Sequence, residues 1–562
     1  MILDFLFSIF LFFLLPVLWL IREIKAVNFW LYLWQLKEYH IGRFIDHFRT
    51  SHGQKLLFDK LVFLKVVLIL VVAFGIPYIL DTFDPEDYLH LDLRLGFSVF
   101  GIIFLVYLLE GLKAARDFFG RSLRIPVPTK KIIALRLFLF FIIVLWWASP
   151  LLGLFLRIPS PYMDPVLGML LYDVLTPFVV AVVVLMLQPF AVLGKRRIIQ
   201  KATKKRATLP NLKVVGITGS YGKTSTKEFL FAILQKKFRV VKTPEHRNSE
   251  VGVSQTILQD LKDDTEIFIC EMGAYNKGGI KLLASIARPN IAILTGANEQ
   301  HLATFGSMEN LLSAEGGQEL VDSLPENGTV IFNGSNKYTQ ELYEKSTISR
   351  KILSGKDIRA ENLTVEKERI SFNLVFGQEN VVITANLLGG YNTENLLLAI
   401  AGAKEFGMTL AEIADVCKTI TPEMGAMKLK KGISGLNVID SIYSANPDGV
   451  IAALEYLKVW PGKKVIVMPC LIELGKASKE VHKRIGEKIA EVCDLAIITT
   501  REHFQDVKEG ARQSEKVIYM ESSQEILEKV KGMVKEGDAV LLEGGKESRV
   551  QRQLLALLSK ND

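Results

Sequence analysis

The sequence predicts an α-helical membrane domain followed by two α/β domains, and three observations predict this order. Hydrophobic residues make up 49% of the 562 residues, and nearly all of the excess lies before about residue 195. A glycine-rich loop, Gly219–Ser225, stands between a short apolar run and a segment of helical character. Apolar runs then alternate with helical segments up to the C-terminus, as in parallel sheets covered by helices. We expect domains at 1–195, 206–415 and 421–562.

Five apolar stretches of the first third are long enough to cross a bilayer, which takes about 20 residues in a helix. They are Ile2–Ile21, Leu61–Leu80, Leu95–Leu112, Ile132–Leu156 and about Gly168–Leu193. A cleaved signal peptide does not fit the first stretch, because its start carries no basic residue and no small-residue cleavage site follows. We therefore expect about five transmembrane helices.

The loops between these stretches alternate in charge. Loops 22–60 and 113–131 and the stretch after residue 194 are rich in Lys and Arg, whereas the intervening loops are acidic or nearly neutral. The positive-inside rule then predicts a multi-pass protein of the cytoplasmic membrane, with its N-terminus outside and both α/β domains in the cytoplasm. The net charge of +8 is concentrated beside apolar segments, which favours membrane lipid over nucleic acid as the partner.

Two features of this region leave the sequence open to interpretation. The aromatic segment 29–37 can be an interfacial helix or can pack against the bundle. Lys65 and Arg136 lie near the ends of spans, where long side chains can reach the headgroups. Because no ionisable residue forms a pattern that demands a transport path, we expect an anchor or lipid-docking domain.

The glycine-rich loop has the context of a phosphate-binding loop: the apolar run Leu212–Thr218 precedes it and a helical segment follows. Glycines let backbone N–H groups close around phosphate oxygens, Lys223 neutralises phosphate charge, and Thr224 can offer its hydroxyl to Mg²⁺. The residues expected to contact ATP here are Gly219, Ser220, Tyr221, Gly222, Lys223, Thr224 and Ser225.

Seven stretches, taken in order, resemble the Mur ligases, and among them the type that adds D-alanyl-D-alanine to a muramoyl tripeptide. The first is the loop itself, which shares the longer spacing of these ligases, with five residues between Gly216 and Gly222. The others are Asn248–Val253; Glu271–Ala274 with Gly279-Ile280; His301-Leu302 with Phe305–Ser307; Gly389–Asn395; Asp440–Pro447; and Glu473–Gly475 followed by His482. The resemblance covers roughly residues 205–562.

The resemblance implies a P-loop central domain, a Rossmann-like C-terminal domain and an ATP-dependent amide ligase. Such an enzyme activates a carboxylate as an acyl phosphate, which an amine then attacks. The implied partners are a muramoyl-peptide or lipid-linked glycopeptide acceptor and D-Ala-D-Ala or another amine, in peptidoglycan synthesis. Two alternatives stay open: a related ligase acting on a lipid-linked wall precursor or a γ-glutamyl chain, and a non-catalytic ATP-binding scaffold.

The resemblance also assigns roles to individual residues. Glu271 and His301 are the implied Mg²⁺ ligands, joined by Thr224, although His301 could be an ordinary loop histidine. Asn392 and Asn395 are implied to hold the adenine; the other interpretation is that they cap a helix, and the two roles are compatible. Lys223, Glu271, His301 and Glu315 are the candidate catalytic residues, and the candidate substrate contacts are Asn248, Ser307, Asp440, Tyr443 and Asn446.

Several positions depart from the family pattern. Glu315 stands where a carbamylated lysine is frequent, so its carboxylate can supply the same charge; the other interpretation is a surface glutamate. Tyr391 stands where histidine is usual, and Ser441, Cys470 and Glu543 stand where aspartate, aspartate and lysine are usual. Ala426 stands where arginine is usual. These departures leave the exact substrate open.

Mur ligases normally begin with a soluble domain that binds the UDP end of the substrate. Only about twenty residues separate the last apolar stretch from the loop strand, which is too few for a domain. We therefore expect a lipid-linked or membrane-proximal acceptor. Within the central domain, the alternating run Ile370–Phe376 predicts antiparallel strands near 355–385.

Overall fold

The computed structural model of the chain describes residues 2–37, 39, 41–48, 51–75, 85–120, 123–155, 165–245, 247–421, 427–443, 445–545 and 548–559. The chain forms two compact units, Met1–Gly194 and Lys195–Asp562, which we call the helical unit and the α/β unit. Ala426, one of the departures from the family pattern, lies outside the described residues.

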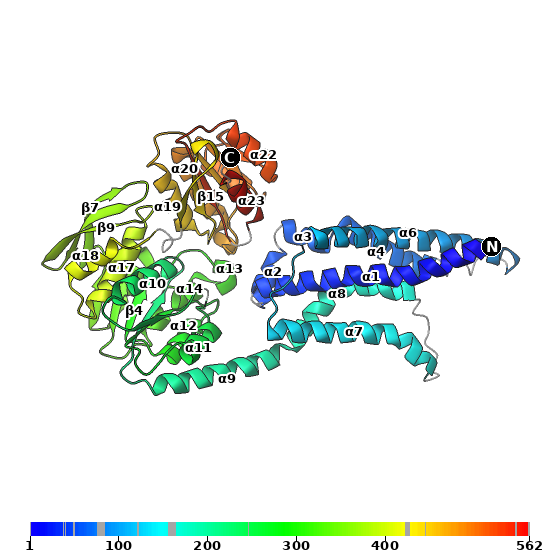
Figure 1. The fold of residues 1–562 in the computed structure, drawn as a ribbon, viewed down its shortest axis with the longest axis horizontal. Helices are drawn as coiled ribbons and strands as arrows, with labels where there is room; N and C mark the ends of the chain where they lie inside the picture. The colour runs from blue at the N-terminus through cyan, green and yellow to red at the C-terminus, as the bar shows by residue number, and fades with distance from the viewer. Residues whose placement is uncertain are drawn as a thin grey trace. The chain divides into compact units, whose positions relative to one another are not determined.

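The helical unit is built from long helices packed side by side (Figure 1). Its elements are α1 (Ile2–Leu36), α2 (Ile41–His47), α3 (Ser51–Leu57), α4 (Lys60–Leu70), a π-helical turn (Val71–Gly75), α6 (Pro85–Phe119), α7 (Lys130–Phe155) and α8 (Pro165–Met186). Helix α9 (Gln188–Ala207) continues the chain into the α/β unit. Each predicted span falls on helix in its described part, although α1 and α6 are much longer than predicted.

Two stretches of the described residues, Ser98–Phe119 and Val166–Ala207, are long and apolar enough to cross a membrane by length and composition. The aromatic segment 29–37 continues α1 and packs against the bundle: Trp34 is buried and stacks on Phe44, with the ring centroids 3.9 Å apart. The packing interpretation of this segment is therefore the correct one. The predicted loop 22–60 begins as helix because α1 does not end until Leu36.

The central domain of the α/β unit has a six-stranded parallel sheet in the order β2-β3-β1-β4-β5-β6. Its strands are β1 (Lys213–Thr218), β2 (Val240–Lys242), β3 (Ile267–Glu271), β4 (Ile291–Leu294), β5 (Thr329–Phe332) and β6 (Arg350–Leu353). The central strands are apolar and buried, as expected when helices cover both faces. The helices are α10 (Lys223–Leu234), α11 (Glu250–Gln259), α12 (Gly279–Ala287), α13 (Leu302–Phe305), α14 (Met308–Ala314), α15 (Gln318–Val321), α16 (Lys337–Lys345), α17 (Asn392–Lys404) and α18 (Leu410–Cys417).

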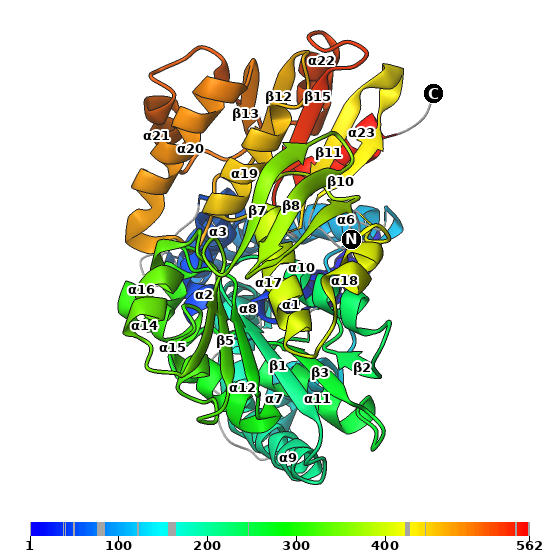
Figure 2. The same ribbon diagram turned by 90° about the vertical axis from the view of Figure 1, so that its left-hand side faces the viewer.

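The predicted antiparallel strands near 355–385 are confirmed. They form a three-stranded sheet of β7 (Ile358–Val365), β8 (Ile370–Phe376) and β9 (Glu379–Ala385), and Figure 2 shows it between the two larger sheets of the α/β unit. Alternate residues of β8 are buried, which is what its alternating sequence predicts.

The C-terminal domain has a second six-stranded sheet in the order β10-β11-β15-β12-β13-β14, parallel except for the edge strand β10. Its strands are β10 (Lys428–Lys431), β11 (Asn437–Ser441), β12 (Lys464–Met468), β13 (Leu495–Ile498), β14 (Val517–Tyr519) and β15 (Ala539–Glu543). The helices are α19 (Pro447–Leu457), α20 (Ser478–Val492), α21 (Phe504–Gly510), α22 (Ser523–Lys531) and α23 (Arg549–Leu558). Strand β15, the last in the sequence, lies in the middle of the sheet between β11 and β12.

Candidate active site

The predicted phosphate-binding loop connects β1 to α10, as the sequence indicates. Gly219 and Gly222 have φ values of +151° and +75°, which L side chains rarely adopt. A Cβ on Gly219 would lie 2.1 Å from Thr295 Oγ1, and one on Gly222 would lie 2.4 Å from Asn395 Oδ1. The loop therefore requires glycine at both positions, and its backbone can approach a ligand closely. Lys223 extends back over the loop and donates to the carbonyls of Gly219 and Ser220.

Glu271 ends β3, next to β1, and its buried carboxylate faces the start of α10. The Thr224 hydroxyl donates to both carboxylate oxygens at 3.2 Å, Asn248 Nδ2 donates at 3.0 Å, and Lys227 Nζ lies 3.0 Å away. Burial alone would raise the pKa of Glu271, but the nearby charges of Lys227 and Lys223 hold it below its usual value. The carboxylate is therefore ionised beside the phosphate loop.

Lys227 is a site residue that the sequence reasoning missed. Its side chain is fully buried and forms an ion pair with Glu271. Helical spacing was the signal that could have found it: Lys227 precedes the buried Leu230 by three residues, which places both on the inner face of α10.

Glu315 follows α14 and is 3% exposed. It accepts a hydrogen bond from Ser220 Oγ at 2.9 Å, and Ser220 Oγ in turn accepts one from the backbone N–H of Asn298. The interpretation as a surface glutamate is wrong, because this carboxylate is buried against the phosphate loop.

His301 precedes α13, and its Nδ1 lies 2.8 Å from Glu473 Oε2 of the C-terminal domain. Among the described residues, no group of three or more His, Cys, Asp and Glu side chains is arranged to hold a metal ion. The structure thus brings Thr224 and Glu271 together but pairs His301 with Glu473. A hydroxyl and a carboxylate beside a phosphate loop are oxygen donors of the kind that Mg²⁺ prefers when phosphates and water complete its shell.

Asn392 and Asn395 begin α17 and are both buried. Asn392 Nδ2 donates to the carbonyl of Leu388 at 2.9 Å, and the N-cap position is held by Tyr391 without a side-chain bond. The alternative role as N-terminal caps is therefore wrong. Asn395 lies against Gly222, as the close approach above shows, so it borders the phosphate loop.

The five candidate substrate residues lie at different places. Asn248 donates to Glu271, and the side chain of Tyr443 shares a hydrogen bond with Thr224, so both border the loop. Asn446 caps α19 and accepts from Gly449 N at 3.0 Å. Asp440 pairs with Lys430 at 3.0 Å. Ser307 caps α14 by accepting from Asn310 N at 3.2 Å.

The two domains of the α/β unit meet beside the loop through polar contacts. Asn298 Nδ2 donates to Asn446 Oδ1 at 3.2 Å and to Asp448 Oδ2 at 3.0 Å. Arg484 lies 3.3 Å from Glu299. These contacts come from the segment that follows β4, so the C-terminal ends of the parallel strands face the second domain, where α/β sheets bind ligands.

Three positions that depart from the family pattern lie together. Ser441 and Glu543 are register partners at the ends of the neighbouring strands β11 and β15. Burial raises the pKa of Glu543 to about 8, although hydrogen bonds from Ser441 and Gly544 oppose the shift. One Glu543 carboxylate oxygen and the Tyr391 hydroxyl are both buried without a hydrogen-bond partner among the described residues, and the charge of Glu543 acts on Tyr391.

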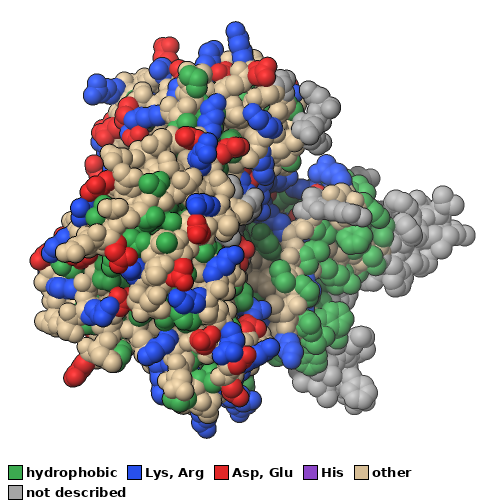
Figure 3. All heavy atoms as spheres, turned by 60° about the vertical axis from the view of Figure 1, so that its left-hand side comes forward, with side chains coloured by type: hydrophobic (Ala, Val, Ile, Leu, Met, Phe, Trp, Pro, Cys, Tyr) green, Lys and Arg blue, Asp and Glu red, His purple; other side chains and the backbone are tan. Residues whose placement is uncertain are grey.

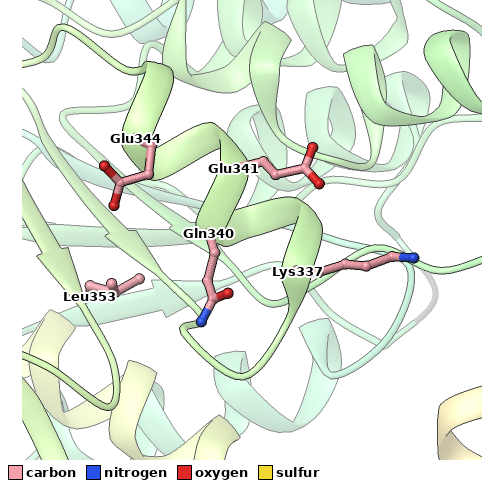
Figure 4. A pocket seen from close by; sticks show the side chains of 5 residues that line it. All are labelled: Lys337, Gln340, Glu341, Glu344 and Leu353. Carbon is pink, nitrogen blue, oxygen red and sulfur yellow. The ribbon is translucent and has the colours of Figure 1, made fainter.

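A surface hollow on α16 carries no comparable chemistry. Figure 4 shows the side chains that line it, Lys337, Gln340, Glu341, Glu344 and Leu353, and they project in different directions from α16 and β6. None of the predicted site residues is among them.

The site has a glycine loop at a helix N-terminus and a buried, ionised carboxylate on the adjacent strand, and a second α/β domain contacts the same edge of the sheet. These features define a P-loop nucleotide-dependent enzyme of two α/β domains. The Mur ligase middle domain matches residues 217–403, and the Mur ligase glutamate ligase domain matches residues 427–545. Together these matches cover more than half of the chain, which belongs to the Mur ligase family of ATP-dependent ligases.

Relatives and solved structures agree with this assignment. The chain is 29% identical over 344 residues to the UDP-N-acetylmuramoyl-tripeptide–D-alanyl-D-alanine ligase of Bacillus subtilis, covering 60% of this chain and 74% of the relative. It is 32% identical over 282 residues to the enzyme of that name from Escherichia coli, covering 49% of this chain and 61% of the relative. The chain thus spans less than two thirds of several of the curated relatives that it matches.

The fold comparison extends over both α/β domains. MurF ligase from Thermotoga maritima in complex with ADP superposes with a TM-score of 0.57 at 26% identity, covering 65% of this chain and 83% of that one. MurF from Acinetobacter baumannii superposes with a TM-score of 0.60 at 24% identity, covering 65% and 81%, and shows likeness of fold.

Proposed function

We propose that this chain is a membrane-anchored ligase that adds D-Ala-D-Ala to the free carboxylate of a muramoyl-peptide precursor of peptidoglycan. The names of its relatives from Bacillus subtilis and Escherichia coli describe that reaction with a UDP-linked tripeptide. The observation that carries the proposal is the contact of Thr224 and Glu271 at the phosphate loop, with Tyr443 of the C-terminal domain bonded to Thr224. It joins the nucleotide site to the domain that would hold the second substrate.

In the proposed reaction the acceptor carboxylate attacks the γ-phosphate of ATP, giving an acyl phosphate and ADP. The amine then attacks the acyl carbon, phosphate leaves, and the amine loses a proton to give the amide. Lys223 and the loop N–H groups neutralise phosphate charge. Mg²⁺, held by Thr224 and Glu271, would supply further charge stabilisation at the phosphates. Lys227 keeps Glu271 ionised for that role.

The proposed membrane anchor is the helical unit. All but four of the exposed large hydrophobic side chains of the described residues lie before residue 195, the exceptions being Leu282, Leu363, Val382 and Ile472. Figure 3 shows this contrast: hydrophobic side chains cover a face of the helical unit, whereas Lys, Arg, Asp and Glu are spread over the α/β unit. Exposed apolar surface on this scale marks a surface that is covered, here by lipid. Labelling of single cysteines in intact cells tests the proposed orientation, with the N-terminus outside and the α/β unit in the cytoplasm.

The proposed acceptor is lipid-linked or held close to the membrane. Helix α9 and a short turn are all that lies between α8 and β1, so no domain that could bind a UDP-sugar stands at this point of the chain. An anchored enzyme would instead find a lipid-linked acceptor at high local concentration. Turnover of UDP-linked and lipid-linked muramoyl peptides by the full chain tests this, and a clear preference for the soluble acceptor would overturn it.

The incoming amine is the least determined substrate. Ser441 and Glu543 stand at the centre of the C-terminal sheet and differ from the family pattern, which favours, as a second candidate, an amide ligase with another amine donor. Mass spectrometry of the products formed with ATP, each acceptor and either D-Ala-D-Ala or other amines separates the two. A non-catalytic scaffold would show no ATP hydrolysis that depends on both acceptor and amine.

A further inference from the structure

Five charged side chains meet inside the helical unit, on four different helices that Figure 1 shows side by side. Arg22 and Glu23 come from α1, Lys65 from α4, Glu110 from α6 and Asp173 from α8. Arg22 pairs with Glu23 at 2.6 Å and also with Asp173. Lys65 pairs with both Glu110 and Asp173. We call these five residues the ionic cluster.

The ionic cluster is buried. Glu23, Lys65 and Asp173 are 0%, 2% and 2% exposed, and the side chains of Arg22 and Glu110 are 19% and 17% exposed. The expectation that Lys65 reaches the headgroups is therefore wrong. Asp173 lies inside the fifth predicted stretch, and its partners come from helices whose packing the sequence did not reveal.

The charges of the ionic cluster do not balance. Two cations, Arg22 and Lys65, face three carboxylates, which leaves one negative charge. Two other cations of the helical unit form no ion pair with the cluster among the described residues: Lys25 pairs with Asp117 at 2.7 Å, and Arg136 of α7 donates to the neutral Asn28 at 2.6 Å. An uncompensated charge in an apolar interior is strongly unfavourable, so a buried carboxylate normally acquires a counter-charge or a proton.

Polar side chains without charge complete the surroundings. The Tyr107 hydroxyl of α6 donates to Asp173 at 3.2 Å, and the Thr176 hydroxyl of α8 donates to Glu23 at 2.8 Å. One turn before Thr176, Tyr172 is 3% exposed, and its hydroxyl has no hydrogen-bond partner among the described residues. Tyr172 lies beside the cluster, because the Thr176 hydroxyl that contacts Glu23 also contacts the carbonyl of Tyr172, at 2.8 Å in both cases.

From the surplus carboxylate and the unpartnered hydroxyl we infer that the ionic cluster binds one small monovalent cation, a proton or Na⁺. A cluster that only holds the helices together would need only paired charges. The third carboxylate therefore distinguishes a cation-binding cluster from a purely structural one. The inference goes beyond the proposed ligase function and does not depend on it, because it concerns residues of the helical unit alone.

The test uses the full chain in phosphatidylcholine nanodiscs. The unfolding midpoint is measured as Na⁺ replaces choline at constant ionic strength and pH, and again as pH is lowered without Na⁺. A ligand that binds only the folded state raises the midpoint with each tenfold rise in its concentration. Infrared spectra at the same pH values report whether a buried carboxyl group is protonated. Because the buried Glu543 also holds a proton at neutral pH, the spectra are recorded on the Glu543→Gln chain, where a protonated carboxyl band assigns the site to a proton. Stabilisation by Na⁺ assigns it to Na⁺.

Matched variants locate the site. Glu110→Gln removes the surplus charge at the most exposed carboxylate, and its amide can still accept from Lys65, so the cation dependence or the carboxyl band should be lost. Lys65→Gln enlarges the surplus of negative charge and should make the unfolding midpoint depend more steeply on cation concentration. Asp117→Asn removes a carboxylate from the balanced pair with Lys25 on the same helices α1 and α6, and should behave as wild type.

The spectra of the Glu543→Gln chain, whose helical unit is unchanged, keep the inference falsifiable even where a variant of the cluster does not fold. A Glu543→Gln chain with neither a protonated carboxyl band nor stabilisation by Na⁺ overturns it. The same follows if Glu110→Gln and Asp117→Asn change the cation dependence equally.

Discussion

The imidazole Nδ1 of His301 lies 2.8 Å from a carboxylate oxygen of Glu473, and both residues have left-handed backbone conformations, with φ of +67° and +66°. This conformation costs a non-glycine residue roughly 1–2 kcal/mol, so packing must hold both turns in place. A second bond runs between the same turns, from Ala303 N to the carbonyl of Glu473 at 2.9 Å. The pair thus fixes the C-terminal domain against the segment that follows β4.

Replacing Glu473 with Ala should lower kcat/KM for ATP-dependent product formation about tenfold, which corresponds to roughly 1.4 kcal/mol. The reason is that the carboxylate no longer orients His301 while the backbone contact remains. Arg484→Met is the matched control, because it breaks the more exposed pair with Glu299 at the same interface, and such pairs contribute little. If both variants lose the same activity, the interface matters in general and the His301 pair does not.

Glu315→Gln should lower the ligase rate by roughly a hundredfold, on the scale of losing one charged group at a transition state. The buried carboxylate accepts from Ser220 in the phosphate loop, and an amide supplies no negative charge there. Rates measured across a Mg²⁺ titration should show a weaker metal dependence. Glu309→Gln, on the exposed face of helix α14, which directly precedes Glu315, is the control. An unchanged rate and Mg²⁺ dependence for Glu315→Gln would show that the carboxylate is structural.

Features that depend on neighbouring residues were predictable from the sequence. The phosphate loop is one: Gly219 and Gly222 are needed because the turn between a strand and a helix puts their backbones at positive φ. Glu271 is another, because an acidic residue that ends an apolar strand must lie at the edge of the sheet. The antiparallel strands near 355–385 followed from their alternating pattern.

Partners that are distant in sequence were not predictable. Ser441 and Glu543 are separated by about one hundred residues and meet only because β15 inserts beside β11. Ser220 and Glu315 meet across β1 and β4 in the same way. In the helical unit, the charge on Lys65 gave no indication of its partners, because hydrophobic periodicity reveals which residues are apolar and not which helices pack together.

The contribution of Glu543 to the free energy of unfolding of the wild-type chain should fall as pH rises from about 5 to 8. Its folded pKa is about 8, above the usual 4.5, so the folded state binds the proton that the unfolded state has already released in this range. Glu543→Gln removes this contribution, and its unfolding midpoint relative to wild type should therefore rise with pH up to about 8 and then level off. Thermal unfolding of both full-length chains from pH 5 to 9 measures this. A constant difference across the range would mean that Glu543 ionises normally.

Lys227→Met should destabilise the chain by roughly 3 kcal/mol at pH 7, because it leaves the buried Glu271 carboxylate without its ion-pair partner. Glu271 has a lowered pKa in the folded state, so its stabilising contribution is present above its unfolded pKa and is lost as pH falls through the folded value. The difference between variant and wild type should accordingly be largest at neutral pH and shrink in acid. Lys237→Met, which breaks the exposed pair with Glu412 at the surface, should cost less than about 1 kcal/mol and serves as the control in the same unfolding series. Equal losses for the two variants at pH 7 would mean that Lys223, Thr224 and Asn248 are enough to hold Glu271 ionised.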